Sequence, residues 1–263
     1  MRVLRFLAIW MMAEFLFLQP SFPAESWLEL KGEHFIIYYL GDEEFAKDVS
    51  RYSERYYRQI ADDLGYTRHS DFWQWDKRVK IYIHATQEEF LKETGRNNWS
   101  HGFADYIAKE IHSYAWNEGF LQSLLPHEIT HLIFRDYVGF KGEVPLWLDE
   151  GVAQWEEPEK RKIVKEVMQS YLMNDYVYPI QHLCELDIRN VTVEFAVQLF
   201  YVQSISVIEF LVTRYGTDKF ITFCRELRDG KSLEVALKFS YPTQIKDLSE
   251  LEEQWKNYVL KTP

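Results

Sequence analysis

The alternation of apolar and polar residues predicts a small sheet with helices in the N-terminal half of the chain. Residues 34–40 form a short run rich in β-favouring residues, and apolar and polar side chains alternate over residues 79–84, so both segments are predicted strands. Between them, apolar residues recur at steps of three and four over residues 45–64. This spacing predicts an amphipathic helix that ends at Gly65.

The pattern becomes helical nearly throughout beyond residue 120. Before that point, residues 86–94 predict a helix that stops at Gly95, and residues 103–116 predict a hairpin near the sheet edge. The helices predicted after it cover residues 120–137, 146–156, 159–173, 192–215, 217–228, 231–239 and 244–260. A small mixed sheet with helices, followed by a mostly helical C-terminal half, is an α+β arrangement.

The N-terminus has the features of a targeting segment rather than of a folded element. Two arginines precede an apolar run, and a patch of small residues around Ala24 follows it, as in a secretory signal. Glu14 interrupts the run, and Phe22 is bulky where a cleavage site needs a small residue. Residues 1–24 are therefore either a cleaved signal or an uncleaved anchor, and we expect export to the periplasm or the extracellular space.

Composition and charge narrow the classes of partner. The formal net charge is −11, with 41 acidic against 30 basic residues, which argues against nucleic acid or an anionic membrane surface as the main partner. We therefore expect membrane contact only through an uncleaved N-terminal segment. Cys184 and Cys224 are too few for a disulfide framework, so they are either two buried thiols or one disulfide. No feature of the sequence indicates a particular oligomeric state.

The segment LLPHEITHLIF, residues 124–134, carries the candidate chemistry. His127 and His131 are four residues apart, so on a helix both side chains point from one face. Two imidazole nitrogens placed in this way can bind one zinc ion at about 2.0–2.1 Å. Glu128 lies about 100° round the helix from His127, where it would take a proton from an attacking water without being a ligand. The helix is otherwise apolar on most sides, and a metal would satisfy its three polar side chains.

A catalytic zinc usually has three protein ligands, so a third should lie downstream. Residues 145–155 offer Glu150, nineteen positions after the second histidine, and also Asp149. Glu150 is the preferred ligand, with Asp149 as its competitor, and small residues such as Gly151 would let this segment approach the motif helix closely. If Glu150 is the ligand, Asp149 or Gln154 would orient a histidine from outside the ligand shell.

With HEITH, eighteen intervening residues and a glutamate within W-L-x-E-G-x-A, the chain resembles the gluzincin metallopeptidases. It resembles the bacterial peptidase MA-like domains more closely still. The resemblance implies a zinc ion bound by His127, His131 and Glu150, with Glu128 as general base. It also implies a zincin-like fold in which the active-site helix lies beside a small sheet. The edge strand of that sheet would hold an extended peptide or protein substrate, and a helical domain would close the cleft.

The resemblance extends over much of the chain after the targeting segment. It implies a single peptidase domain over residues 25–263, with a sheet-containing lobe at 25–140 and a helical lobe at 141–263. By order along the chain, Tyr201 corresponds to the tyrosine that stabilises the oxyanion in the aminopeptidase branch, although a core role for Tyr201 is an equal alternative. The G-x-M-E-N segment of that branch is absent before the motif, so endopeptidase cleavage is at least as well supported as exopeptidase cleavage.

Further polar residues near the predicted cleft have two interpretations each. His101 and His112, in the hairpin region, would either bind substrate or be ordinary hydrogen-bonded histidines. Asp105 would either contact a substrate amine or be a turn carboxylate. The charged run at 156–162 is expected to be the exposed start of a helix.

The sequence therefore predicts a zinc metallopeptidase with a peptide or protein substrate. The alternative is a non-catalytic, exported or membrane-anchored binding module that retains the scaffold. The intact Glu128 favours the enzyme, because a structural metal site needs no base.

Overall fold

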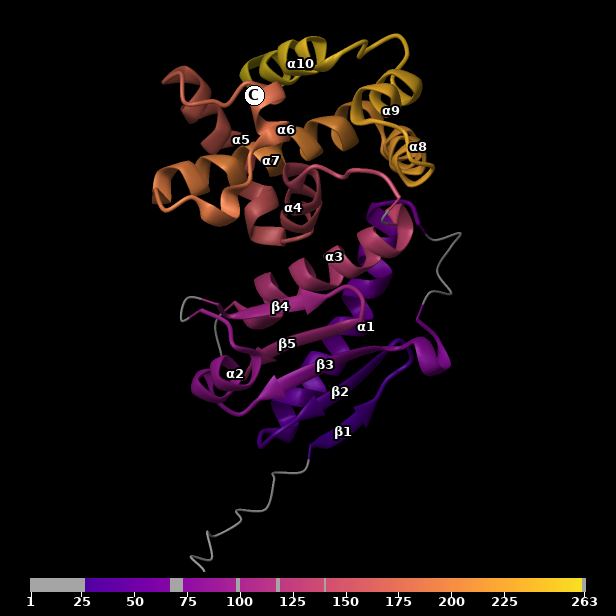
Figure 1. Cartoon of the computed structure of the whole chain (residues 1–263), viewed down its shortest axis with the longest axis vertical. Helices are drawn as coiled ribbons and strands as arrows, with labels where there is room; N and C mark the ends of the chain where they lie inside the picture. Colours follow the sequence, from indigo (N-terminus) through magenta and orange to yellow (C-terminus); the bar gives the residue numbers. More distant parts are fainter. Residues whose placement is uncertain (1–26, 67–72, 98–99, 117–118, 140, 262–263) are drawn as a thin grey trace, which may run out of the picture.

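Helix α3 (Leu125–Val138) lies between a five-stranded sheet and a group of helices, as Figure 1 shows. The computed structural model describes residues 27–66, 73–97, 100–116, 119–139 and 141–261. The signal or anchor predicted for residues 1–24 lies outside these ranges. The predicted α+β fold is confirmed, because the sheet and its helices come first along the chain and a mostly helical half follows.

The sheet is mixed and has the strand order β1-β2-β3-β5-β4. The middle pairs β2–β3 and β3–β5 are parallel, whereas β1 pairs with β2 and β4 pairs with β5 in antiparallel fashion. The strands are β1 (Leu28–Lys31), β2 (Phe35–Tyr39), β3 (Val79–His84), β4 (Gly102–Asp105) and β5 (Glu110–Tyr114). The predicted strands and edge hairpin are confirmed, and β4 forms the edge next to α3. Strand β1 was not predicted, because it has only four residues and is mostly exposed.

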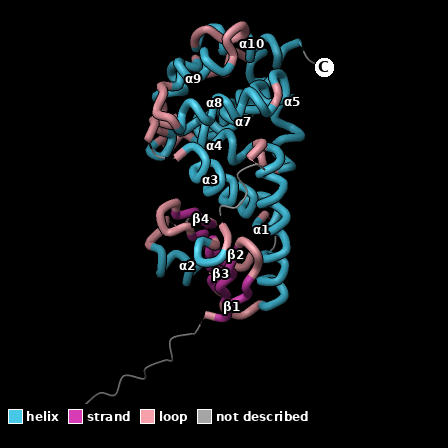
Figure 2. Tube along the Cα trace, turned by 90° about the vertical axis from the view of Figure 1, so that its right-hand side faces the viewer, coloured by secondary structure: helices cyan, strands magenta, loops and turns pink. Residues whose placement is uncertain are grey.

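The two faces of the sheet differ in what covers them. Ile37, Ile81 and Ile111, from neighbouring strands, are buried in the core. Helix α1 (Glu43–Asp63) packs on this side, and the shorter α2 (Gln87–Thr94) lies on the other side, as the edge-on view in Figure 2 shows. Both helices are capped at their N-termini by side chains. Helix α2 ends directly before the expected Gly95, whereas α1 ends two residues before Gly65.

The helical half begins with α4, which packs directly against α3. Its elements are α4 (Leu146–Trp155), α5 (Pro158–Met173), α6 (Ile180–Glu185), α7 (Glu194–Tyr215), α8 (Thr217–Arg228), α9 (Leu233–Ser240) and α10 (Leu248–Lys261). The predicted helices are confirmed to within four residues at each end, apart from the start of the motif helix. Helix α6 was not predicted, because six residues are too few to establish a helical period.

Helix α7 is the central helix of this half. Its 22 residues and mean hydropathy of 1.7 would suit a membrane span, but 61% of that apolar stretch is buried inside the protein, as expected of a core helix. Gly151 of α4 faces α7, and a Cβ added there would lie 2.7 Å from the backbone oxygen of Ser204. The expectation that Gly151 would let α4 approach the motif helix closely was therefore wrong. The glycine allows α7 to pack closely against α4 instead.

Both cysteines are free thiols. Cys224 is buried in the core, and the half-buried Cys184 accepts a hydrogen bond of 3.3 Å from the indole nitrogen of Trp147. Of the two alternatives left by the sequence, the unpaired thiols are confirmed.

Candidate metal centre

The motif helix starts later than the sequence predicted. Residues 120–124 form a π-helical turn, η3 (Phe120–Leu124), in which the Leu124 amide donates to the Gly119 carbonyl at 3.0 Å, and α3 begins only at Leu125. Pro126 explains the break, because it has no amide hydrogen to donate to the preceding turn. Gly119 adopts a φ of +93°, which glycine tolerates far better than other residues. The turn sets the position of the first motif histidine.

The structure brings together the three side chains predicted as metal ligands. The Nε2 atoms of His127 and His131 are 3.1 Å apart. The Oε2 atom of Glu150, from α4, lies 3.6 Å from Nε2 of His127 and 3.9 Å from Nε2 of His131. Ligands placed tetrahedrally around zinc at about 2.0–2.1 Å are separated by about 3.4 Å. The three atoms therefore have nearly the spacing that one zinc ion requires.

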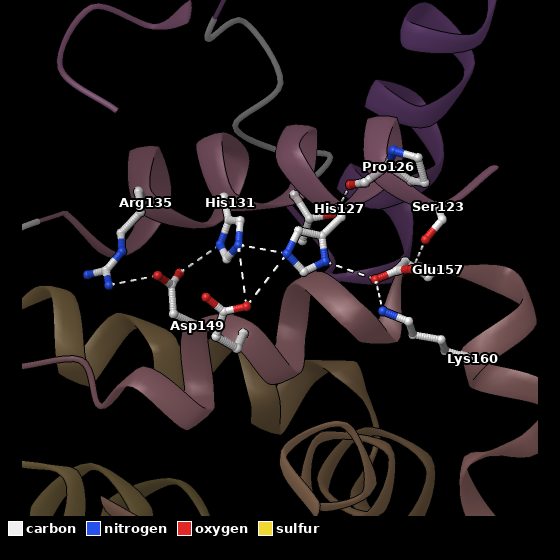
Figure 3. A network of polar contacts seen from close by, with 10 residues as sticks. Ser123, Pro126, His127, His131, Arg135, Asp149, Glu157 and Lys160 are labelled. Atoms are coloured by element: carbon white, nitrogen blue, oxygen red, sulfur yellow. Dashed lines mark hydrogen bonds and ion pairs between the residues drawn. The ribbon is translucent and has the colours of Figure 1, made fainter. Parts of the chain in front are cut away.

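Each histidine is held from behind by a carboxylate (Figure 3). Nδ1 of His127 lies 2.9 Å from Oε1 of Glu157, and Nδ1 of His131 lies 3.4 Å from Oδ1 of Asp149. A carboxylate beside Nδ1 holds a proton on that nitrogen, so Nε2 is the nitrogen that a metal ion can bind in place of a proton. Two imidazole Nε2 atoms and a carboxylate oxygen thus converge on one point. The donor set fits a divalent cation such as zinc.

The two supporting carboxylates are anchored by further polar groups. Asp149 accepts a hydrogen bond of 2.9 Å from Nη2 of Arg135, which lies one turn beyond His131 on α3. Glu157 accepts from Nζ of Lys160 at 2.7 Å and from the Ser123 hydroxyl. Both histidine rings are therefore fixed by chains of contacts that end in a cation.

Electrostatics at the centre favour positive charge. Burial alone would lower the pKa of His127, but the Glu150 and Glu157 carboxylates outweigh it and raise that pKa to about 10. The pKa of His131 is also raised, because Asp149 and Glu150 outweigh burial. Conversely, the pKa of Glu150 is lowered against the effect of burial, chiefly by the two histidines. A site in which carboxylates attract protons onto imidazoles would also attract a metal ion.

Glu128 lies beside the three converging atoms but is not one of them. It is 8% exposed, and burial raises the pKa of its carboxyl despite the two neighbouring histidines. The backbone of Ala104, on the edge strand β4 that packs against α3, has a smaller opposing effect and lowers that pKa. A buried carboxyl with a raised pKa, beside the two histidines and on a helix that packs against the edge strand, is suited to proton transfer.

Tyr201 of α7 lines the same cavity as His127 and Glu128, which measures about 340 Å³. Burial, with the nearby charges of Glu150 and Glu128, raises the pKa of its phenol. The hydroxyl therefore stays protonated at neutral pH and can donate a hydrogen bond. Its place in the cavity is compatible with the predicted oxyanion role.

Of the three polar residues predicted in the hairpin region, His101 lines this cavity, whereas His112 and Asp105 do not. Nδ1 of His101 lies 2.7 Å from the Tyr114 hydroxyl. His112 lies elsewhere, because its ring stacks between Tyr82 and Phe103 on the sheet face that carries α2. Asp105 accepts hydrogen bonds from two backbone amides of the β4–β5 turn. Of its two interpretations, the turn carboxylate therefore agrees with the structure.

The expectation that residues 156–162 are an exposed helix start was wrong for its first two residues. Glu156 and Glu157 are only 1% and 2% exposed. Glu157 is buried because it holds His127, a role expected from Gln154, which instead lines the cavity. A histidine that binds a metal through one ring nitrogen usually donates a hydrogen bond from the other, so a nearby acceptor should be sought in the sequence. That search could have identified Glu157. Two glutamates follow directly after the predicted ligand helix.

Comparison with known proteins agrees with this geometry. The sequence model of the Peptidase MA superfamily matches residues 70–261, a range that includes both motif histidines, Glu128, Glu150 and Tyr201. No curated protein matches the chain.

Proposed function

Because the chain belongs to the Peptidase MA superfamily, we propose that it is a zinc-dependent metallopeptidase. The observation that carries the proposal is the convergence of Nε2 of His127, Nε2 of His131 and Oε2 of Glu150 on one point. The carboxylates behind both histidines and the buried Glu128 beside them support it. A structural zinc site would have no use for that extra carboxyl.

When bound, zinc supplies a Lewis acid that polarises the scissile carbonyl and lowers the pKa of water. Glu128 takes a proton from the attacking water and passes it to the leaving amine, as its raised pKa allows. The protonated Tyr201 hydroxyl donates to the carbonyl oxygen as negative charge develops there. Asp149 and Glu157 keep the histidine rings oriented throughout.

The edge strand β4 supplies a surface for the peptide or protein substrate. Among the described residues it pairs with a strand on one side only, β5, so its other side offers backbone groups to an added extended strand. Helix α3, which carries Glu128, packs against β4, so that edge lies beside the helix of the proposed base. We propose that the scissile bond lies where the edge strand passes the metal ligands.

Export is part of the same proposal. The features of residues 1–24 support transfer out of the cytoplasm, with the segment either removed or kept as an anchor. N-terminal sequencing of the protein recovered from the exporting cell decides between the two forms.

Hydrolysis of a diverse peptide library, with and without a chelator, tests the proposed function. We expect cleavage that the chelator abolishes and added zinc restores. The Glu128→Gln variant should bind zinc as the wild type does but should cleave at least about a hundredfold more slowly. Zinc binding without any cleavage by the wild type would contradict the enzyme and favour the non-catalytic binding module.

A further inference from the structure

A second cavity lies between α5 and α7, and its walls are mostly aliphatic. It measures about 280 Å³ and is lined by Val164 and Val167 of α5 and by Val202 and Ile205 of α7. Val164 and Ile205 are 3% and 2% exposed, so they form a floor continuous with the core. Val167 and Val202 are only partly buried, so they stand at the walls.

This cavity adjoins the cavity at the candidate metal centre. Gln154, Lys160 and Tyr201 line it and also line the cavity that contains His127 and Glu128. The two cavities therefore share one wall, formed by the end of α4, the start of α5 and α7. A peptide held beside Glu128 would have its neighbouring side chain at the mouth of the aliphatic cavity.

We propose that the cavity between α5 and α7 is a specificity pocket for an aliphatic or aromatic side chain that flanks the scissile bond. The inference rests on the proposed peptidase function and names the class of substrate. Burial against aliphatic walls stabilises an apolar side chain, whereas a carboxylate would lose hydration there. Lys160, which lines the cavity, is already paired with Glu157 at 2.7 Å.

The size of the cavity is consistent with one side chain rather than a whole ligand. Pockets for small molecules measure about 300–1,000 Å³, and this cavity of about 280 Å³ lies just below that range. The pocket would therefore select one position of the substrate. The rest of the peptide would be recognised largely through its backbone, along β4.

Cleavage of a random library of end-blocked hexapeptides, followed by sequencing of the products, tests the pocket. We expect leucine, isoleucine, valine, methionine or phenylalanine at one position flanking the cut, enriched about tenfold or more over alanine. The Val167→Asp variant should lose that preference and should favour lysine or arginine at the same position. Met173→Asp is the matched control, because Met173 lies on the same helix, is 68% exposed and is outside the pocket.

A binding measurement separates failure of this inference from failure of the proposed function. The library is passed over immobilised Glu128→Gln protein loaded with zinc, and the retained peptides are sequenced. Apolar enrichment that Val167→Asp removes would support the pocket even if the wild type cleaves nothing. Cleavage or retention without apolar preference in the wild type, or a preference unchanged by Val167→Asp, would overturn it. If Val167→Asp does not fold, Gln198→Glu introduces the same negative charge at an exposed residue of the pocket lining. The loss of apolar preference is then measured with that variant.

Discussion

At the scale of single residues, the buried carboxylates around the metal centre are the main finding. A buried carboxylate is costly unless it is paired. Glu157 is paired with His127, Lys160 and the Ser123 hydroxyl. These contacts fix the rotamer of the imidazole before any ion binds. They also make the ring a better ligand, because the proton on Nδ1 is shared with a carboxylate.

Replacing Glu157 by glutamine should therefore weaken zinc binding. We expect a loss of about 10–100-fold in zinc affinity for Glu157→Gln, the usual effect of removing a carboxylate behind a ligand histidine. Competition with a chromophoric chelator measures the affinity. Glu159→Gln is the control, because the Glu159 side chain is 78% exposed and contacts only Lys162 among the ion pairs of the described residues. Equal zinc affinity in the two variants would show that Glu157 does not support the ligand.

At the scale of elements, the approach of α4 to α7 sets the position of Glu150. Gly151, the next residue, lies against the backbone of α7, where an added Cβ would be 2.7 Å from the oxygen of Ser204 and 2.9 Å from Ile208. No ordinary side chain fits without moving one helix. Since Glu150 is on α4 and both histidines are on α3, a shift of α4 would move the third proposed ligand away from the other two.

The Gly151→Ala variant should therefore lose both stability and zinc affinity. Overpacking of this kind costs about 1–3 kcal/mol. Chemical denaturation of the metal-free protein and chelator competition measure the two effects. Ser170→Ala, at an exposed position of α5, should change stability by less than about 0.5 kcal/mol. A Gly151→Ala protein with wild-type stability and zinc affinity would mean that the close approach of α4 and α7 is not required.

At the scale of the whole molecule, the residues of the candidate metal centre come from both halves of the chain. The histidines belong to α3, which packs on α1 and β4, whereas Glu150 belongs to α4, which packs on α7. A zinc ion bound by both helices would hold the sheet-containing half against the helical half. Because zinc would bind the folded chain and not a site that exists in the unfolded chain, binding would add to the stability of the fold.

Removal of zinc should therefore lower the melting temperature. Saturation at about a hundred times the dissociation constant contributes about 2.7 kcal/mol, which corresponds to about 5–10 °C for a chain of this size. Scanning calorimetry with and without a chelator measures the shift. The Glu150→Ala variant should melt at the same temperature under both conditions. If the melting temperature of the wild type is the same with and without the chelator, that result would contradict a zinc ion held between the sheet-containing half and the helical half.

How much of this arrangement the sequence predicts depends on the range of the interactions. The pairing of His127 with His131 follows from helical spacing alone, and Glu150 was found by its distance from them along the chain. Glu157 was missed because its contact with His127 forms across the junction of two helices. The partner of Gly151 was misjudged for the same reason, since periodicity shows that a helix is packed but not which neighbour it meets.

Anomalous diffraction at the zinc absorption edge, on crystals grown with zinc, tests the metal assignment most directly. We expect one strong peak within about 2.0–2.2 Å of Nε2 of His127, Nε2 of His131 and a carboxylate oxygen of Glu150. Glu128 should lie outside the coordination sphere. A peak bound by Asp149 in place of Glu150, or no peak between the two histidines, would contradict the proposed metal centre.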